Sequence, residues 1–365
     1  MRPRKRVDSF FLWIVIGLVS IGTFIFISAW FGLLVREEVR YSSVFFMHTV
    51  SIVLGFAALF IASKVPYQFW KKSSFYIFVG SIVLTLLVFI PGLGVTHGGA
   101  TRWLDIGVTS IQPAEFLKIG FLLYFAALLS SLKGDINSLR DGVLPIFGIF
   151  AIIGVILVKQ PDTGTFMVIF ASGLAMFIAA GGKWKYIMAF VMSGITTITA
   201  LAYARPYIME RFLTFFDPAR DSLDAGWQIK QSLIAIGSGG VFGRGFGQSI
   251  QKFGYLPEPI GDSIFAVAAE EFGFIGAATI IVLFLLLAFR GLQIAKKTPN
   301  QFSGLLVTGI VILIIAQSFI NIGAMLGVLP LTGMPLLFIS HGGTAFILVM
   351  FAMGIILNIS KYTKS

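Results

Sequence analysis

Apolar stretches of about 20 residues recur from one end of the chain to the other, and they constrain its fold more than any other feature. A helix of that length spans the roughly 30 Å hydrocarbon core of a bilayer. Only 12% of the residues are charged, whereas a soluble domain carries about 25%. A water-soluble fold could not bury this much apolar surface, so the sequence predicts an all-α integral membrane protein forming a single polytopic domain.

Clusters of glycine and proline, together with charged residues, divide this apolar sequence into about ten predicted helices. The helices are expected at residues 10–35, 44–63, 74–91, 112–131, 143–158, 165–181, 184–203, 263–290, 303–328 and 336–358. The basic start of the chain and the apolar run after it have the charge pattern of a signal sequence. That run is longer than the roughly 7–15 apolar residues of a cleaved signal, so we expect it to be retained as the first helix.

The distribution of lysine and arginine predicts the orientation, because short cytoplasmic loops carry an excess of both. One set of segments holds Arg2, Arg4, Lys5, Arg6, Lys64, Lys71, Lys72, Lys133, Arg140, Lys183, Lys185, Arg290, Lys296, Lys297, Lys361 and Lys364. The opposite short loops hold only Arg36, Arg40, Arg102 and Lys159. We therefore expect both termini in the cytoplasm. The net charge of +11 reflects topology, and no basic stripe points to a nucleic-acid partner.

One connection, residues 204–261, is much longer than the others and is expected outside the cytoplasm. Loops of this length within a compact domain are usually functional or disordered. Trp227, the apolar run 232–236 and a dense series of glycines between 237 and 247 argue against disorder. Glycine lets the backbone bend sharply or approach a ligand closely. The prediction is a structured cap over a cavity, in which a short helix can dip back into the bilayer.

Ionisable residues within predicted membrane helices are costly, so each is a hypothesis about function. Glu115 and Lys118 are three residues apart and share a helix face, so they either form an internal ion pair or serve a ligand. Glu270 and Glu271 are interpreted as structural, helix-packing residues.

Some residues of the predicted outer loops can have either a structural or a functional role. Arg102 beside Trp103 is either an interfacial anchor or part of a site. Asp162 either caps the following helix or faces a ligand. His341 is interpreted as a hydrogen-bonded packing residue, and neither it nor the other histidines has the spacing of a metal motif. The chain has no cysteine, which excludes thiol chemistry.

Taken together and in order, the outer segments resemble the SEDS (shape, elongation, division, sporulation) family of FtsW, RodA and SpoVE. The matching stretches are 99–103, 112–118, 161–165, 211–218, 226–228, 231–240, 256–258, Asp262, 264–267, Glu270 with Glu271, 321–323, 330–333 and 340–343. The resemblance spans nearly the whole membrane region. Modest departures are Thr101, residues 259–261, Ser263 and His341.

The resemblance implies a ten-helix peptidoglycan glycosyltransferase, with FtsW-like favoured over RodA-like. Such an enzyme polymerises lipid II on the outer face of the bacterial cytoplasmic membrane during cell division or elongation. It also implies partners: a class B penicillin-binding transpeptidase and other divisome or elongasome membrane proteins.

Polymerisation joins a sugar hydroxyl to an anomeric carbon with loss of a polyprenyl pyrophosphate. A weak hydroxyl nucleophile needs a general base, and Asp262 matches the catalytic aspartate position of the family. The alternative is that Asp262 only caps the following helix. Lys, Arg or a divalent cation (Mg²⁺ or Mn²⁺) would meet the leaving-group charge, and no cofactor beyond that is expected. The candidate substrate-binding residues are Arg102, Glu115, Lys118, Asp162, Arg211, Gln231, Ser232, Lys252, Glu258 and Ser340.

Two other functions remain open at this stage. One is a different membrane glycosyltransferase that uses a lipid phosphate donor. The other is a lipid II flippase or another polytopic transporter, in which membrane charges would be stations on a path. The short cytoplasmic loops, which carry little beyond topology charges, favour the enzyme.

Overall fold

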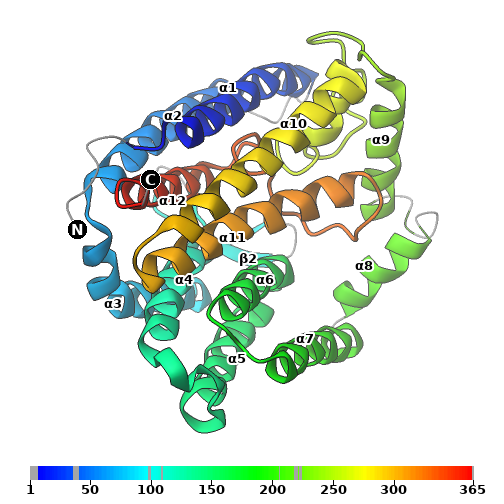
Figure 1. The fold of residues 1–365 in the computed structure, drawn as a ribbon. Helices are drawn as coiled ribbons and strands as arrows, with labels where there is room; N and C mark the ends of the chain where they lie inside the picture. The colour runs from blue at the N-terminus through cyan, green and yellow to red at the C-terminus, as the bar shows by residue number, and fades with distance from the viewer. Residues whose placement is uncertain are drawn as a thin grey trace.

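The computed structural model describes residues 7–35, 41–97, 100–107, 110–204, 206–217, 221 and 224–363. Within these residues nine helices are long and apolar enough to cross a membrane, and α6 is a shorter apolar helix (Figure 1). The ten are α1 (Ser9–Phe31), α2 (Tyr41–Lys64), α3 (Tyr67–Leu86), α4 (Pro113–Leu132), α5 (Leu144–Lys159), α6 (Thr163–Ala179), α7 (Trp184–Ala204), α10 (Ile264–Lys297), α11 (Gln301–Met325) and α12 (Gly343–Ser360). The predicted polytopic helical fold is confirmed.

Some helix ends differ from the prediction. Helix α3 begins at Tyr67, directly after Pro66, which is extended and suits the residue before a helix. Helix α10 continues to Lys297 instead of ending near 290. The last helix begins at Gly343 and not at 336. The chain turns before it, with the Ser340 hydroxyl accepting the Leu336 N–H at 2.8 Å and Phe338 at a φ of 67°.

A small antiparallel sheet between α3 and α4 was not predicted. It consists of β1 (Gly94–His97), β2 (Ala100–Asp105) and β3 (Ser110–Ile111), in the order β1-β2-β3. Leu104 of β2 is paired with Gly94 on one side and Ile111 on the other. Strands this short carry too little alternation to be recognised from the sequence. The sheet matters because β2 carries Arg102.

The long connection at 204–261 is structured where it is described. It contains α8 (Pro206–Phe216) and α9 (Ala225–Ser238), followed by turns up to Ser263. Helix α9 packs against α10 and α11, and Figure 1 shows it at one end of the bundle, beside the start of α10.

The centre of the bundle is formed by α4, α11 and α12, whose side chains are mostly buried. Helix α12 packs closely against α2, and a Cβ at Gly354 would lie 2.4 Å from the Leu59 carbonyl oxygen. Small residues allow such close helix packing in membranes. Large apolar side chains on α2, α3, α7 and α10 remain exposed, as expected for surfaces that face lipid.

Some residues used in the sequence analysis lie outside the described part of the chain. These are Arg2 to Arg6, Arg36, Arg40, Gly99, Pro218 and Lys364.

Candidate functional site

Asp262 lies in the last turn before α10, where side chains from α9 and α11 hold it in place. The Gln228 amide of α9 donates to Asp262 Oδ1 at 3.1 Å and to the Ser263 hydroxyl at 2.9 Å. The Asn321 amide of α11 donates to the Asp262 carbonyl at 2.8 Å. Ser263 is the N-cap of α10, so the hypothesis that Asp262 only caps this helix is wrong. The Asp262 carboxylate therefore does not serve as the N-cap of α10.

The turn before Asp262 is fixed by the segment that precedes α12. Ser340 donates from its hydroxyl to the Gly261 carbonyl at 2.6 Å, and the His341 N–H donates to the Ile260 carbonyl at 2.8 Å. Within the turn, the Gly261 and Ser263 amides both donate to the Glu258 carbonyl. Ser340, predicted to bind substrate, thus holds the backbone beside Asp262.

The surroundings of Asp262 change its acidity. Burial raises the pKa of this carboxyl to about 6, and the neighbouring Glu258 carboxylate adds to the rise. The Gln228 hydrogen bond and the Arg211 charge oppose it. A carboxylate with a pKa near the working pH is suited to act as a general base.

A cavity of about 740 Å³ opens in front of Asp262. Its wall contains two arginines and two carboxylates, Arg102, Arg211, Glu258 and Asp262, together with His341. Strand β2, helix α8 and the turn before α10 bring the arginines and carboxylates together. The combination of a raised-pKa carboxylate with two guanidinium groups suits a reaction in which a proton is removed and an anion leaves.

Arg102 and Arg211 lie close enough for their charges to interact. Arg102 donates through Nε to the Gln160 carbonyl at 3.0 Å and through a terminal nitrogen to the Pro161 carbonyl. Burial and, secondarily, the like charge of Arg102 lower the pKa of Arg211. An anionic ligand between the two guanidinium groups would relieve this repulsion.

Asp162 is buried and is not part of the cavity wall. Its Oδ1 accepts the Thr165 N–H at 3.2 Å, so it caps α6 as the structural reading predicted. The Asp162 carboxylate also interacts electrostatically with Arg211.

The other predicted site residues are buried outside the cavity wall. Glu115 and Lys118 form an ion pair at 2.8 Å, and Lys118 also donates to Gln317 Oε1 at 2.7 Å. Gln317 in turn donates to the carbonyl of Pro335, which lines the cavity. The structure therefore places this pair one layer behind the cavity.

Gln231 and Ser232 of α9 are buried, and the Ser232 hydroxyl contacts the Met325 sulfur of α11 at 3.4 Å. Lys252 is also buried, and it pairs with Glu271. The sequence could not separate these inward-facing residues from those that face the cavity.

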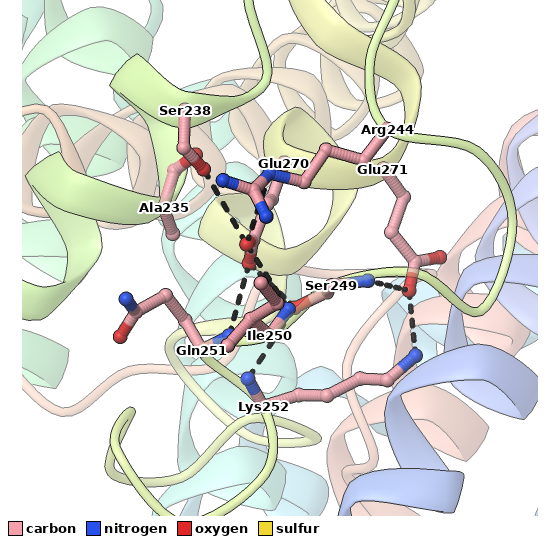
Figure 2. A network of polar contacts seen from close by, with 9 residues as sticks. All are labelled: Ala235, Ser238, Arg244, Ser249, Ile250, Gln251, Lys252, Glu270 and Glu271. Carbon is pink, nitrogen blue, oxygen red and sulfur yellow. Dashed lines mark hydrogen bonds and ion pairs between the residues drawn. The ribbon is translucent and has the colours of Figure 1, made fainter.

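Sequence reasoning missed Gln228 and Asn321 as site residues, although both lie in stretches that carry the family resemblance. For Asn321 the available signal was an amide side chain inside a predicted apolar helix, where it needs a hydrogen-bond partner. Gln228 lies in the predicted outer loop, where an amide side chain carries no such signal. Glu270 and Glu271, interpreted as structural or helix-packing residues, do have structural contacts, and these form a polar network between the preceding loop and α10 (Figure 2).

The described residues contain no group of three or more histidine, aspartate or glutamate side chains placed to hold a metal ion. Glu258 and Asp262 are the two carboxylates in the cavity wall. Mg²⁺ is commonly held by one or two carboxylates together with substrate phosphates, and these two residues fit that pattern.

Comparison with known proteins finds relatives that match most of the chain. Stage V sporulation protein E of Bacillus subtilis (strain 168) is 39% identical over 85% of this chain and 85% of its own length. The probable peptidoglycan glycosyltransferase FtsW of Escherichia coli O6:H1 is 35% identical over 98% of this chain and 86% of its own.

Solved structures share the fold. A structure described as the structural coordination of polymerization and crosslinking by a peptidoglycan synthase complex matches with a TM-score of 0.81 and 24% identity, covering 98% of this chain and 99% of that chain. The rod shape determining protein RodA of Thermus thermophilus matches with a TM-score of 0.71 and 22% identity, covering 98% of each chain. The family model for FtsW, RodA and SpoVE, described as a cell cycle protein, matches residues 9–365, and the chain belongs to this family.

Proposed function

We propose that this chain, a peptidoglycan glycosyltransferase of the bacterial cytoplasmic membrane, uses Asp262 as the general base when it polymerises lipid II. Family membership and the names of the relatives support the glycosyltransferase activity. The observation that carries the residue assignment is the Asp262 carboxyl, with its pKa raised to about 6, in a cavity wall that also holds two arginines.

In the proposed step Asp262 removes the proton from the 4-hydroxyl of one lipid-linked disaccharide. The hydroxyl oxygen then bonds to the anomeric carbon of a second lipid-linked chain, and the bond from that carbon to pyrophosphate breaks. The polyprenyl pyrophosphate leaves with the bonding electrons. A positioned base typically accelerates such a step by about 100- to 10,000-fold.

Arg102, Arg211 and Glu258 are proposed to contact the substrate, because they line the cavity with Asp262. The arginines supply positive charge where the pyrophosphate departs. A divalent cation bound at Glu258 and the substrate phosphates would add to that charge. Glu115, Lys118, Asp162 and Ser340 are proposed to act by holding these residues and the cavity wall in place.

The activity is tested with labelled lipid II and the protein purified together with its proposed transpeptidase partner, reconstituted in vesicles. The enzyme produces glycan polymer, whereas a flippase or transporter moves unpolymerised lipid II between leaflets. Translocation without polymer would reject the proposed function.

We also propose that both termini are cytoplasmic and that residues 204–261 form an outer cap over the cavity. The absence of cysteine makes this testable, because a single introduced cysteine is unambiguous. Asp221→Cys is expected to react with an impermeant thiol reagent in intact spheroplasts. Lys297→Cys is the matched control and should react only after permeabilisation. The reverse pattern would overturn the orientation.

A class B penicillin-binding transpeptidase is the proposed partner, together with other division or elongation membrane proteins. The described part of the chain is mostly membrane helix and contains no separate domain for peptide crosslinking. A similar fold occurs in the peptidoglycan synthase complex described above. Purification in mild detergent is expected to recover the transpeptidase and to lose polymerase activity when it is removed. Full activity of the isolated chain, with no such protein recovered, would contradict the pairing.

A further inference from the structure

Helix α10 is broken within its apolar span, at Gly273, where φ is 64° and ψ is −162°. A short turn from the preceding loop fills the break. The Phe274 and Ile275 amides donate to the carbonyls of Gly240 and Val241, and the Arg244 and Gly245 amides donate to those of Glu270 and Glu271. Backbone groups freed at membrane depth must find such protein partners.

The close backbone contact at this break requires glycine in both segments, Gly273 in α10 and Gly243 in the inserted turn. Gly243 has a φ of 81°, and a Cβ there would lie 2.1 Å from the Glu271 carbonyl oxygen. A Cβ at Gly273 would lie 2.3 Å from the Gly243 backbone nitrogen in the inserted turn. The loop before α10 is therefore built into this helix and does not simply lie over it.

Glu270 binds the next part of the same loop, as Figure 2 shows. Its carboxylate accepts the Ser249 hydroxyl at 2.6 Å, and the Ile250 and Gln251 amides at 3.1 and 3.3 Å. Arg244 lies 3.7 Å from the same carboxylate. These contacts fix the backbone of residues 249–251 against the first part of α10.

Glu271 and Lys252 form the adjacent buried pair, with a distance of 2.6 Å between Lys252 Nζ and Glu271 Oε1. Both side chains are 0% exposed. Ser28 of α1 joins them, accepting from Lys252 at 2.8 Å and donating to Glu271 at 2.6 Å. The Ser249 amide also donates to Glu271. The pair thus ties the loop to α10 and to α1.

Asp262 lies in the chain between residues 249–252 and the two glutamates, Glu270 and Glu271, that bind them. After Lys252, the Leu256 amide bonds to the Gln251 carbonyl, and Trp227 of α9 donates to the Tyr255 carbonyl at 2.9 Å. The chain then reaches Asp262, and α10 leads back to Glu270 about two helical turns later. Residues 249–271 form a loop with its two ends joined by the carboxylates, which restricts the positions open to Asp262.

We propose that Lys252 is a positioning residue for Asp262, acting through Glu271 and the closed loop 249–271. Lys252 itself does not face the cavity, so it acts on the reaction without touching substrate. Loss of its ammonium leaves Glu271 buried without its cation and releases residues 249–252 from α1. Asp262 then loses its fixed distance to the sugar hydroxyl, and a misplacement of about 1 Å can slow a reaction about a hundredfold.

This inference rests on the proposed role of Asp262, so its test has a readout apart from activity. Lys252→Met is compared with Lys72→Met, which replaces an exposed lysine of α3. Hydrogen exchange of the Leu256, Gly261 and Ser263 amides is measured with the vesicle-reconstituted protein. Lys252→Met is expected to raise exchange there at least about tenfold, leaving α4 and α11 protected. It should also lower kcat at least about tenfold with little change in KM.

Ser28→Ala serves as a milder second variant in case Lys252→Met unfolds. It removes the hydroxyl that accepts from Lys252 at 2.8 Å and donates to Glu271 at 2.6 Å, and so weakens the link of the pair to α1. The same two effects, in smaller measure, are expected.

Unchanged exchange at residues 256–263 in the folded variants would overturn the inference, as would raised exchange with unchanged kcat. A fully active Asp262→Asn protein would instead reject the proposed base, whatever the exchange data show. The two failures are therefore distinguishable.

Discussion

Asp262→Asn is expected to polymerise lipid II at least about a hundredfold more slowly than the unmodified protein. Asparagine has the same shape, and its side-chain oxygen can still accept the hydrogen bond from Gln228. It cannot take a proton from the sugar hydroxyl at neutral pH. Because Ser263 and not Asp262 occupies the N-cap position of α10, the substitution leaves the helix start intact.

The measurement is glycan polymer formed from labelled lipid II at equal amounts of inserted protein. Asp105→Asn, at an exposed position of β2, is the matched control and should keep full activity. Near-normal polymer from well-folded Asp262→Asn would remove Asp262 as the base. Glu258, the other carboxylate in the cavity wall, would then be the next candidate.

The same assignment sets the pH dependence of the unmodified enzyme. A general base works in its ionised form, so activity is present above the pKa of Asp262 and lost below it. With that pKa at about 6, kcat/KM should fall to half near pH 6 and about tenfold per pH unit below. An ordinary aspartate would place the decline near pH 4. A profile flat down to pH 5 would contradict the raised pKa.

Lys118→Met is expected to destabilise the folded protein by about 3–5 kcal/mol. Glu115 and Lys118 are both almost completely buried and lie 2.8 Å apart, so removal of the cation leaves a carboxylate without its counter-charge. Lys118 also loses its bond to Gln317, which reaches the cavity wall at Pro335. Replacement of both members by apolar residues, in Glu115→Leu with Lys118→Met, should recover most of the loss.

Thermal unfolding in detergent measures this difference, with Lys72→Met as the exposed control. A double variant no more stable than Lys118→Met would show that the pair is not the source of the effect. The polymer assay on the stable double variant then reports separately whether the pair supports catalysis.

The sequence by itself determined the membrane class, most helices and the candidate base. These features depend on properties that are local in the chain, since a helix can span a bilayer on length and apolarity alone. The ordered motifs identified the family, and Asp262 could be chosen because it ends a glycine-rich segment just before an apolar helix. None of this needed knowledge of which helices are neighbours.

Only the tertiary structure decided which charged residues share a site. Arg211 lines the cavity while Lys252 is buried against Glu271, although both lie in the same long connection. Likewise, the broken α10 and the network of Glu270 and Glu271 involve the loop that precedes this helix and folds back into it, together with Ser28 of α1. Such contacts depend on which way each side chain points in the assembled bundle, and sequence spacing constrains that direction only within one helix or strand.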